Sequence, residues 1–466
     1  MTLPGTSDEI ATQPAVGEGV ARLRSLLERR PLYIGIETTN ICNAACVFCA
    51  YPKMRRDHAV MSPELFAKII RDYVDMGGGA VGLTPIVGDA LVDPMLVGRM
   101  RLLADTPAVT ATSFTTNGIA WRRFSAKDQL FMLERTACVN ISIGGLDAVS
   151  YRRMFAVDRF EQVRAAIHGM CDMKARHGLP VEIHLMFRVN RPIDELMEDP
   201  RMNEWRRDEI ASITGINSFG NWGGMVTTDD LPEGAHLVPA DTSAPAVRRT
   251  KRHACFVYYS NPEITASGIV SACGCMNAEV EALVLGDVSK THLADIWNGP
   301  AFRRLKASFG TDALPDICKQ CTYYADGEAF MRHPALAAFE VGDNPWELIR
   351  RHASPSASTV LAAALTPLVA ARCARIALYG AGAFTRRALA APDFDVRRFH
   401  IVAIIDDNQA LQGTRLAEVT VVSAKAAVAM RLDAAVISTD RYVAAMWDAA
   451  KPLRDAGIRV VRPGLA

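Results

Sequence analysis

The sequence lacks several features that mark whole classes of protein. It has almost no excess of either charge, because 52 Lys and Arg stand against 51 Asp and Glu, a formal net charge of +1. A dedicated nucleic-acid-binding protein normally carries a basic excess, so this balance argues against that class. No internal repeat and no low-complexity tract is visible. The charge balance instead favours a small substrate.

Long apolar runs are missing as well. The longest Ala-rich run, Val360–Ala371, is interrupted by Pro367 and stops at Arg372, which is too short to cross a bilayer. The first 18 residues are polar, carry Asp8 and Glu9, and lack the charged-then-apolar pattern of a signal peptide. We therefore expect a cytoplasmic protein with no membrane partner.

Cysteine, in contrast, is plentiful. The 466 residues include 11 cysteines within an otherwise ordinary globular composition, half hydrophobic and 22% charged. In a reducing compartment cysteines bind metals or react more often than they form disulfides. We therefore interpret these cysteines as ligands first. The length predicts about three domains.

Short apolar runs alternate with helical patterns over the first half of the chain. Strands are expected at Leu32–Ile36, Ala80–Ile86, Ala111–Phe114, Val139–Ile143 and Val181–Val189, and helices at Pro63–Met76, Asp93–Leu103, Phe124–Leu133 and Phe160–His177. This alternation predicts an α/β fold of βαβ units around a parallel sheet, open or partly closed. About six units fit before residue 225.

Composition shifts divide the chain further. We expect an N-terminal lead and amphipathic helix over 1–30, an α/β core over 31–245 and a small cysteine-rich module over 246–340. A linker is expected over 341–370 and a second α/β domain over 371–466. Pro31 ends the first helix, because proline cannot continue one.

Three cysteines follow directly after the first expected strand. Cys42, Cys46 and Cys49 are spaced C-x3-C-x2-C, and the aromatic Phe48 precedes the third. Three closely spaced thiolates can hold three irons of a cubane cluster and leave the fourth iron open to another ligand. A zinc knuckle lacking one ligand and three unrelated buried cysteines are the alternatives, which the spacing and position disfavour.

This loop resembles the C-x3-C-x-aromatic-C signature of the radical S-adenosylmethionine (SAM) superfamily, over about residues 30–225. The resemblance implies a partial (β/α)6 TIM barrel and a SAM-binding 4Fe–4S cluster. It also implies reductive cleavage of SAM to methionine and a 5′-deoxyadenosyl radical that abstracts hydrogen. An external electron donor such as flavodoxin or ferredoxin is then expected.

Two further segments resemble the SAM-binding segments of this superfamily. Gly88 and Asp89 stand where members place a Gly-Gly-Glu-Pro segment for the SAM amino group, although Asp89 replaces Glu and Ala90 replaces Pro. Thr116 and Asn117 belong to a Thr-Asn-Gly turn that ends the next strand, beside the expected SAM site.

A serine and an arginine resemble the pair that binds the SAM carboxylate. They are Ser142 and Arg153, eleven residues apart, and a guanidinium fork suits the two carboxylate oxygens. Phe48 is expected at the same cofactor site. Gly144 stands where many relatives have Asp, so the role of that Asp is not carried over.

A second group of cysteines lies further along the chain. Cys255 and Cys273 form C-x12-G-x4-C with Gly268, and Cys318 and Cys321 form C-x2-C. Four thiolates can close an iron–sulfur or a zinc site, so a structural zinc ribbon is the alternative. We expect Cys273 as the fourth ligand because it completes the spacing, with its neighbour at position 275 as a spare thiol.

Beside a radical SAM core, this second group resembles the SPASM extension in its shortened twitch form. The spacing C-x17-C-x44-C-x2-C is similar to that of the aminocyclitol dehydrogenases that oxidise 2-deoxy-scyllo-inosamine. The resemblance implies one auxiliary 4Fe–4S cluster, a plausible acceptor for the electron that a substrate radical loses in dehydrogenation. The other cysteines, Cys138, Cys171 and Cys373, are expected to be small buried hydrophobes.

The C-terminal part carries a glycine-rich turn. The segment 379–385 reads Tyr-Gly-Ala-Gly-Ala-Phe-Thr after an expected strand, and Asp406 and Asp407 end the next strand. This G-x-G-x-x-T pattern indicates a Rossmann-like domain about half the size of a dinucleotide fold. It resembles small domains found with surface-polysaccharide and nucleotide-sugar enzymes. Nucleotide binding and a docking role both stay open.

Taken together, the motifs favour a radical SAM oxidoreductase that abstracts hydrogen from a small polyol, sugar, nucleotide sugar or aminocyclitol. A radical SAM epimerase and a peptide maturase are alternatives, as is a non-enzymatic iron–sulfur scaffold or sensor with a ligand-binding Rossmann-like module. Arg188 and the segment 217–224 are expected near the barrel mouth. No catalytic acid or base is assigned.

Overall fold

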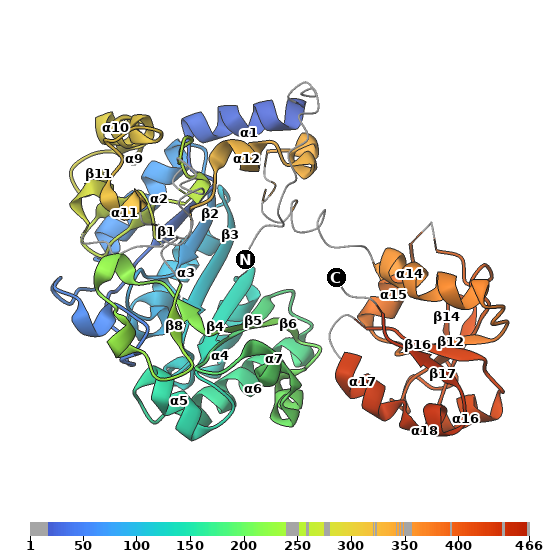
Figure 1. The fold of residues 1–466 in the computed structure, drawn as a ribbon. Coiled ribbons are helices and arrows are strands. Elements are labelled where there is room, and N and C mark those ends of the chain that lie inside the picture. The colour runs from blue at the N-terminus through green and yellow to red at the C-terminus, as the bar shows by residue number, and fades with distance from the viewer. Residues whose placement is uncertain are drawn as a thin grey trace. The chain divides into compact units, whose positions relative to one another are not determined.

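The computed structural model describes residues 17–238, 251–257, 261–274, 280–319, 321, 324–341, 343, 345, 348, 357–391, 394–439 and 443–463. The chain divides into two compact units, Met1–Ile349 and Arg350–Ala466. The second unit is drawn in orange and red in Figure 1.

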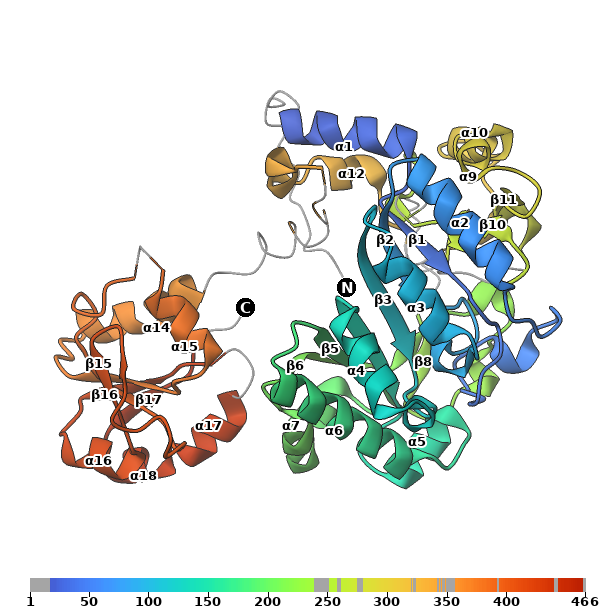
Figure 2. The same cartoon turned by 180° about the vertical axis from the view of Figure 1, so that it is seen from behind.

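Six parallel strands form the centre of the first unit. They are β1 (Tyr33–Ile36), β2 (Gly79–Leu83), β3 (Val109–Thr116), β4 (Cys138–Ile143), β5 (Glu182–Arg188) and β6 (Ile210–Ile216), and they lie side by side in chain order. The helices between them are α2 (Pro63–Asp75), α3 (Leu96–Ala104), α4 (Ala126–Glu134), α5 (Ala148–Phe155), α6 (Phe160–His177) and α7 (Ile193–Glu198). Figures 1 and 2 show helices on the outer side of the strands, as in the expected partial (β/α)6 barrel.

The two faces of these strands differ in polarity. In β4, Val139, Ile141 and Ile143 are buried in the main hydrophobic core, whereas Asn140 and Ser142 alternate with them and stay partly exposed. Side chains of a strand point to opposite faces in turn. The face away from the helices is therefore polar, and it is the inside of the partial barrel.

The cysteine-rich segment continues the same sheet. β9 (Glu263–Ile264) pairs in parallel with β1, and β10 (Ile269–Ser271) and β11 (Val284–Asp287) follow antiparallel, giving nine strands in all. Gly268 has a φ of +92° in the turn between β9 and β10. A residue with a side chain rarely adopts that conformation, which explains the glycine in the second cysteine motif.

Short helices surround this extension. They are α9 (Leu293–Ile296), α10 (Pro300–Ser308), α11 (Asp316–Lys319) and α12 (Gly327–Met331). Helix α1 (Glu18–Arg29) packs Leu23 and Leu26 into a cluster with Phe256 and Phe330. The indole Nε1 of Trp297 also donates to the backbone oxygen of Leu27 at 3.1 Å. The N-terminal helix thus covers the cysteine-rich region.

The remaining elements of the first unit are short. The strands β7 (Ser218–Phe219) and β8 (His236–Leu237) form a separate pair. The 3-10 turns are η1 (Tyr51–Lys53), η2 (Ala90–Val92), η3 (Trp121–Arg123), η4 (Pro200–Trp205), η5 (Trp222–Gly224), η6 (Thr228–Asp230), η7 (Glu281–Leu283) and η8 (Pro334–Ala338).

The second unit has its own sheet. Its strands are β12 (Ile376–Tyr379), β13 (Ile401–Ile405), β14 (Arg415–Leu416), β15 (Val419–Val422), β16 (Ala434–Ile437) and β17 (Arg459–Val461), in the order β14-β15-β13-β12-β16-β17. All pairs except β14–β15 are parallel. The five parallel strands therefore follow the 3-2-1-4-5 order of doubly wound α/β folds. The helices are α14 (Ala357–Ala370), α15 (Ala383–Leu389), α16 (Ala424–Ala429), α17 (Val443–Ala449) and α18 (Lys451–Asp455).

The expected linker over 341–370 requires correction. Its second half forms α14, whose Leu361, Leu365 and Leu368 are buried in the core of the second unit. Pro367 lies inside this helix rather than ending it. Among the described residues, no helix is both long and apolar enough to span a membrane.

Candidate functional site

The first three cysteines lie in the loop that follows β1. Backbone hydrogen bonds fix this loop against the end of α5: the amide of Ala45 donates to Phe155 at 3.2 Å, and that of Val47 donates to Met154 at 3.0 Å. The amide of Tyr51 donates to the Cys49 sulfur at 3.4 Å. The loop is therefore held in one conformation by its neighbours and by its own turn.

The three cysteines are partly buried and share one largely desolvated environment. Burial raises the pKa of Cys42 to about 12, and it raises the pKa values of Cys46 and Cys49 as well. The charges of Cys42 and Cys49 add to this effect at Cys46, while Arg188 opposes it. Protonated thiols are weak nucleophiles, whereas a coordinating metal deprotonates a thiol outright. This donor set therefore suits metal binding better than nucleophilic catalysis.

The type of metal site follows from the arrangement. Within the described ranges, no three His, Cys, Asp or Glu side chains are placed as ligands of a single ion. In a cubane cluster each thiolate binds a different iron. Three interacting, partly buried thiols with a guanidinium nearby fit such a cluster.

Phe48 is packed between several groups inside this loop. Its ring stacks on Phe219 at 4.8 Å and meets Phe155 edge-on at 5.6 Å. The Arg188 guanidinium lies 5.2 Å from the ring centroid, and the Trp222 indole donates to the Phe48 carbonyl at 2.8 Å. The segment 217–224, which sequence placed near the barrel mouth without a role, thus contacts the cysteine loop directly.

Two other predicted segments meet the same loop. The side-chain amide of Asn117 donates to Asn43 Oδ1 at 2.8 Å and to the Cys42 sulfur at 3.6 Å. Gly88 has a φ of +112°, and a Cβ there would lie 2.7 Å from the Thr39 carbonyl oxygen. The structure therefore brings the turns after β2 and β3 together with the cysteine loop, and only glycine fits at position 88.

Asp89 connects these turns. Its carboxylate accepts hydrogen bonds from the backbone amide of Leu91 at 2.9 Å, the backbone amide of Asn117 at 2.6 Å and the Thr116 hydroxyl at 2.9 Å. Burial raises its pKa to about 6, and these hydrogen bonds act in the opposite direction. Because both Asp89 oxygens accept hydrogen bonds from the Thr116–Asn117 turn, Asp89 holds that turn in place.

The structure does not bring Arg153 to Ser142. Arg153 is exposed on α5, whereas Arg188 at the end of β5 donates through Nε to the Ser142 hydroxyl at 3.2 Å. Arg188 lies two residues beyond Met186, the register partner of Ser142 on the neighbouring strand. Strand register therefore places Arg188 beside Ser142, where the eleven-residue spacing in the sequence had suggested Arg153.

Below Ser142, the inside of the barrel carries a row of polar side chains. Thr115 pairs in register with Asn140, Asn140 with His184, and His184 with Ser212, so the row crosses four neighbouring strands. His184 Nδ1 is 2.5 Å from the Ser212 hydroxyl. All four side chains are partly exposed. The sequence signal for this row was only the alternation of polar and apolar residues along each strand.

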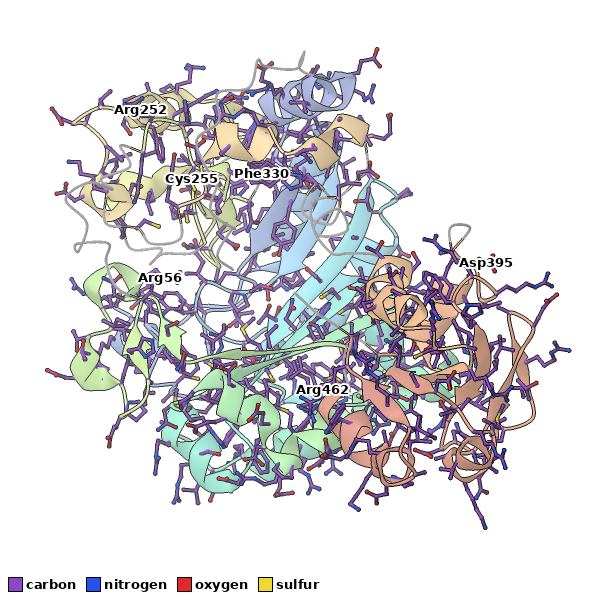
Figure 3. All side chains as sticks on the ribbon, turned by 45° about the vertical axis from the view of Figure 1, so that its right-hand side comes forward. Arg56, Arg252, Cys255, Phe330, Asp395 and Arg462 are labelled. Atoms are coloured by element: carbon purple, nitrogen blue, oxygen red, sulfur yellow. The ribbon has the colours of Figure 1, made fainter. Side chains whose placement is uncertain are left out.

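The other four predicted ligands also lie together. Cys255, Cys273, Cys318 and Cys321 line one cavity, whose other walls are Ala272, Leu283, Leu305, Phe309, Ile317 and Tyr324. Burial raises the pKa of Cys318 to about 11, and Cys321 and Cys255 add to that shift. Figure 3 labels Cys255. Four thiols in an apolar pocket suit an iron–sulfur cluster, whose properties depend on such a shell.

The remaining cysteines are divided. Cys171 is fully buried in α6, as expected for a packing residue, while Cys373 is partly buried. Cys138 lies on the inside face of β4, with its sulfur 3.7 Å from Asn140 Oδ1. The cysteine at position 275 lies outside the described residues, so its choice against Cys273 stays a prediction.

In the second unit, the two acidic residues that follow β13 accept hydrogen bonds from residues in or beside the glycine-rich turn. Asp406 accepts from the Ala381 amide at 2.7 Å, inside the glycine-rich turn. Asp407 accepts from the Tyr379 hydroxyl at 2.6 Å. The Thr385 hydroxyl donates to the Gly380 carbonyl at 2.6 Å. These contacts brace the turn from within.

Comparison with known families matches two parts of the chain. The radical SAM superfamily matches residues 36–199, and SPASM, described as an iron–sulfur cluster-binding domain, matches residues 255–322. Neither match extends into the second unit, so its Rossmann-like assignment stays a prediction.

Similar curated proteins are GTP 3′,8-cyclases. That of Alkaliphilus oremlandii is 26% identical over 237 residues, covering 47% of this chain and 72% of the relative. That of Synechococcus elongatus is 26% identical over 199 residues, covering 41% and 55%. A probable GTP 3′,8-cyclase of Methanothermobacter marburgensis is 30% identical over 210 residues, covering 44% and 61%.

The chain also resembles solved structures. One is BtrN in complex with AdoMet and 2-DOIA, at 14% identity and a TM-score of 0.40, covering 64% of this chain and 95% of that one. Streptococcus suis SuiB bound to S-adenosylmethionine has 14% identity and a TM-score of 0.47, covering 70% and 80%. From the family matches, residues 36–199 belong to the radical SAM superfamily, with its 4Fe–4S cluster and SAM, and residues 255–322 form a SPASM domain, which implies auxiliary iron–sulfur binding.

Proposed function

We propose that this protein is a radical SAM oxidoreductase that removes hydrogen from a small, hydroxyl-rich substrate, namely a polyol, sugar, nucleotide sugar or aminocyclitol. SAM bound at the first cluster supplies, when reductively cleaved, a 5′-deoxyadenosyl radical that abstracts the hydrogen. The polar row inside the barrel carries the assignment of the substrate class.

That row favours a ligand rich in hydroxyl groups. Asn140, His184 and Ser212 present amide, imidazole and hydroxyl groups at matching heights on three adjacent strands. An apolar substrate would cover these partly exposed groups and keep water from the donors and acceptors that the His184–Ser212 contact leaves free. A polar group that is buried without a partner costs about 1–3 kcal/mol. Hydroxyl groups both donate and accept, so they match all three.

The cofactor side of the site lies immediately above this row. We assign Cys42, Cys46 and Cys49 to the cluster, and Ser142 with Arg188 to the SAM carboxylate. A guanidinium offers two parallel donors to a carboxylate, which favours Arg188 for this role. Phe48, Gly88, Asp89, Thr116 and Asn117 complete the cofactor pocket in this proposal, and they close it against water.

The second cysteine group gives the reaction an internal electron acceptor. A carbinol radical becomes a ketone by losing the hydroxyl proton and one electron. Cys255, Cys273, Cys318 and Cys321 lie in an apolar pocket, where a cluster is shielded from solvent. We assign the electron to that cluster and the proton to the polar row.

The curated relatives favour a second candidate, a radical reaction on a guanosine nucleotide. These relatives are 24–30% identical to this chain over 156–237 residues. A triphosphate calls for several cationic donors. Among the inward-facing strand residues named above, Arg188 is the single arginine or lysine.

One labelling experiment separates the two candidates. The anaerobically reconstituted protein is incubated with SAM, a reductant and deuterated polyols, sugars, nucleotide sugars, aminocyclitols or GTP, and the 5′-deoxyadenosine is analysed by mass spectrometry. We expect deuterium transfer from one hydroxyl-rich substrate together with formation of its ketone. Transfer from GTP alone would establish the second candidate and overturn the first.

A further inference from the structure

A lysine lies against the auxiliary-cluster pocket. The Lys251 ammonium donates to the backbone oxygens of Lys319 at 3.0 Å and Cys321 at 2.7 Å, and also to that of Cys318. It also lies 5.4 Å from the centroid of the Tyr324 ring. Arg252 and Cys255, close to it in sequence, mark this region in Figure 3.

The geometry fixes this charge in place. A lysine ammonium has three N–H donors, and three carbonyl oxygens of one short turn are its acceptors. The turn is the C-x2-C segment that carries Cys318 and Cys321. A flexible surface lysine would not direct all three donors to one turn, because ordering its side chain costs up to about 2 kcal/mol of rotamer entropy.

The charge also acts on the thiols. Cys321, Cys318 and Cys255 each attract the Lys251 ammonium when they are thiolates. Three of the four expected ligands therefore interact electrostatically with this one ammonium.

Two other charged groups of this region, Asp326 and Lys319, have partners other than the C-x2-C turn. Asp326 caps α12 by accepting from the Ala329 amide at 2.9 Å, and it lies 3.0 Å from His253 Nδ1. The ammonium of Lys319, between the two cysteines in sequence, pairs with Asp316 at 3.0 Å on the surface. Lys251 is thus distinguished from Lys319 by burial and by its contacts with the turn.

We propose that Lys251 is a positioning residue that raises the reduction potential of the auxiliary cluster. When the cluster accepts one electron, its net charge becomes more negative by one. A fixed ammonium beside its ligands stabilises that reduced form, and net charge and hydrogen bonding are among the factors that set cluster potentials. The proposal deepens the proposed function, since a higher potential makes the cluster a better acceptor for the substrate electron.

The test uses the full chain with Cys42→Ala, Cys46→Ala and Cys49→Ala, so that the auxiliary cluster is the only one present. Lys251→Gln removes the charge but keeps a donor, and Lys251→Arg keeps the charge. Lys319→Gln is the matched control, because it removes an exposed charge of the same turn. Iron content and the midpoint potential from an EPR-monitored redox titration are measured without SAM or substrate.

We expect about four irons in each protein, a negative shift of the midpoint for Lys251→Gln, a smaller shift for Lys251→Arg, and almost none for Lys319→Gln. An unchanged midpoint in Lys251→Gln, or an equal shift in Lys319→Gln, would overturn the role of this charge. Loss of iron in both Lys251 variants would also overturn it, in favour of a purely structural role. A parent protein without iron would instead refute the auxiliary cluster, and with it the electron acceptor of the proposed function.

Discussion

Arg188 shows how strand register decides which side chain reaches a site. It contacts Ser142 across 46 residues of sequence, whereas the short spacing favoured Arg153. Arg153 follows β4 in the next helix and is exposed. A short spacing pattern identifies residues that are close along one segment of the chain. Neighbouring parallel strands are separated in sequence by a helix, so residues that meet across them are far apart in the chain. The cysteine motif needed no such information, because its three ligands occupy a single loop.

Replacing Arg188 should therefore weaken SAM binding. We expect Arg188→Ala to lose about 2 kcal/mol, or roughly 30-fold in affinity, because a charge-assisted contact with the carboxylate disappears. Arg188→Lys should lie between, since it keeps the charge without the fork. Arg153→Ala is the control and should leave the SAM dissociation constant of the reconstituted protein unchanged. A large loss in the control with none in Arg188→Ala would restore the spacing-based assignment.

Glu37 joins several segments around the cysteine loop. Its fully buried carboxylate is bound by Arg56 through two contacts of 2.6 and 3.0 Å, and it accepts from the Val87 amide at 3.3 Å and the Ala266 amide at 3.4 Å. Residue 266 belongs to the turn between β9 and β10. The carboxylate therefore connects the first strand to the SPASM extension, and Arg56 is labelled in Figure 3.

Breaking this pair should destabilise the first unit. We expect Arg56→Ala to cost about 3–5 kcal/mol, because it leaves the Glu37 charge buried without its partner. Lys53→Ala is the control: the Lys53–Asp230 pair is partly exposed, and such pairs contribute about 0–1 kcal/mol. The thermal unfolding midpoint of each variant checks this. Equal midpoints in the two variants would contradict the role of Glu37.

The elements that sequence predicted well are those with strong periodicity. Strands β1 to β5 and helices α2, α3, α4 and α6 lie close to their expected ranges, because alternating or helical apolar patterns mark them. The strands β9 to β11 have only two to four residues each, so no period is visible. The pairing of these strands with one another, and of β9 with β1, is a tertiary effect that sequence patterns do not report.

The C-x2-C turn gives a prediction that separates the two clusters. Cys318→Ala with Cys321→Ala should leave about four of about eight irons, because only the auxiliary pocket loses ligands. SAM cleavage to 5′-deoxyadenosine should persist in that variant. Changing Cys42, Cys46 and Cys49 to Ala should abolish the cleavage instead. Iron and sulfide analysis checks the first outcome; a content near eight irons would refute the twitch-type site.

The domain boundaries predicted from the sequence differ from those in the structure in two places. The second was expected from residue 371, but its core begins with α14 at Ala357. An Ala-rich segment with an internal proline shows little amphipathic pattern, so its packing could not be inferred. The radical SAM and SPASM regions are one sheet, although the cysteine motifs suggested two modules.

Separate cores predict that the first unit works without the second. Among the described residues, the hydrophobic clusters draw their members either from positions 20–348 or from positions 357–461, and none combines the two. We therefore expect a chain ending at Ile349 to bind about eight irons and to cleave SAM as the full chain does. A matched chain carrying the three Cys-to-Ala changes at 42, 46 and 49 is the negative control. If the shortened protein binds SAM but no longer transfers hydrogen from a substrate that the full chain accepts, the second unit contributes to substrate binding. If the shortened protein loses its irons, the two units fold as one and the prediction is wrong.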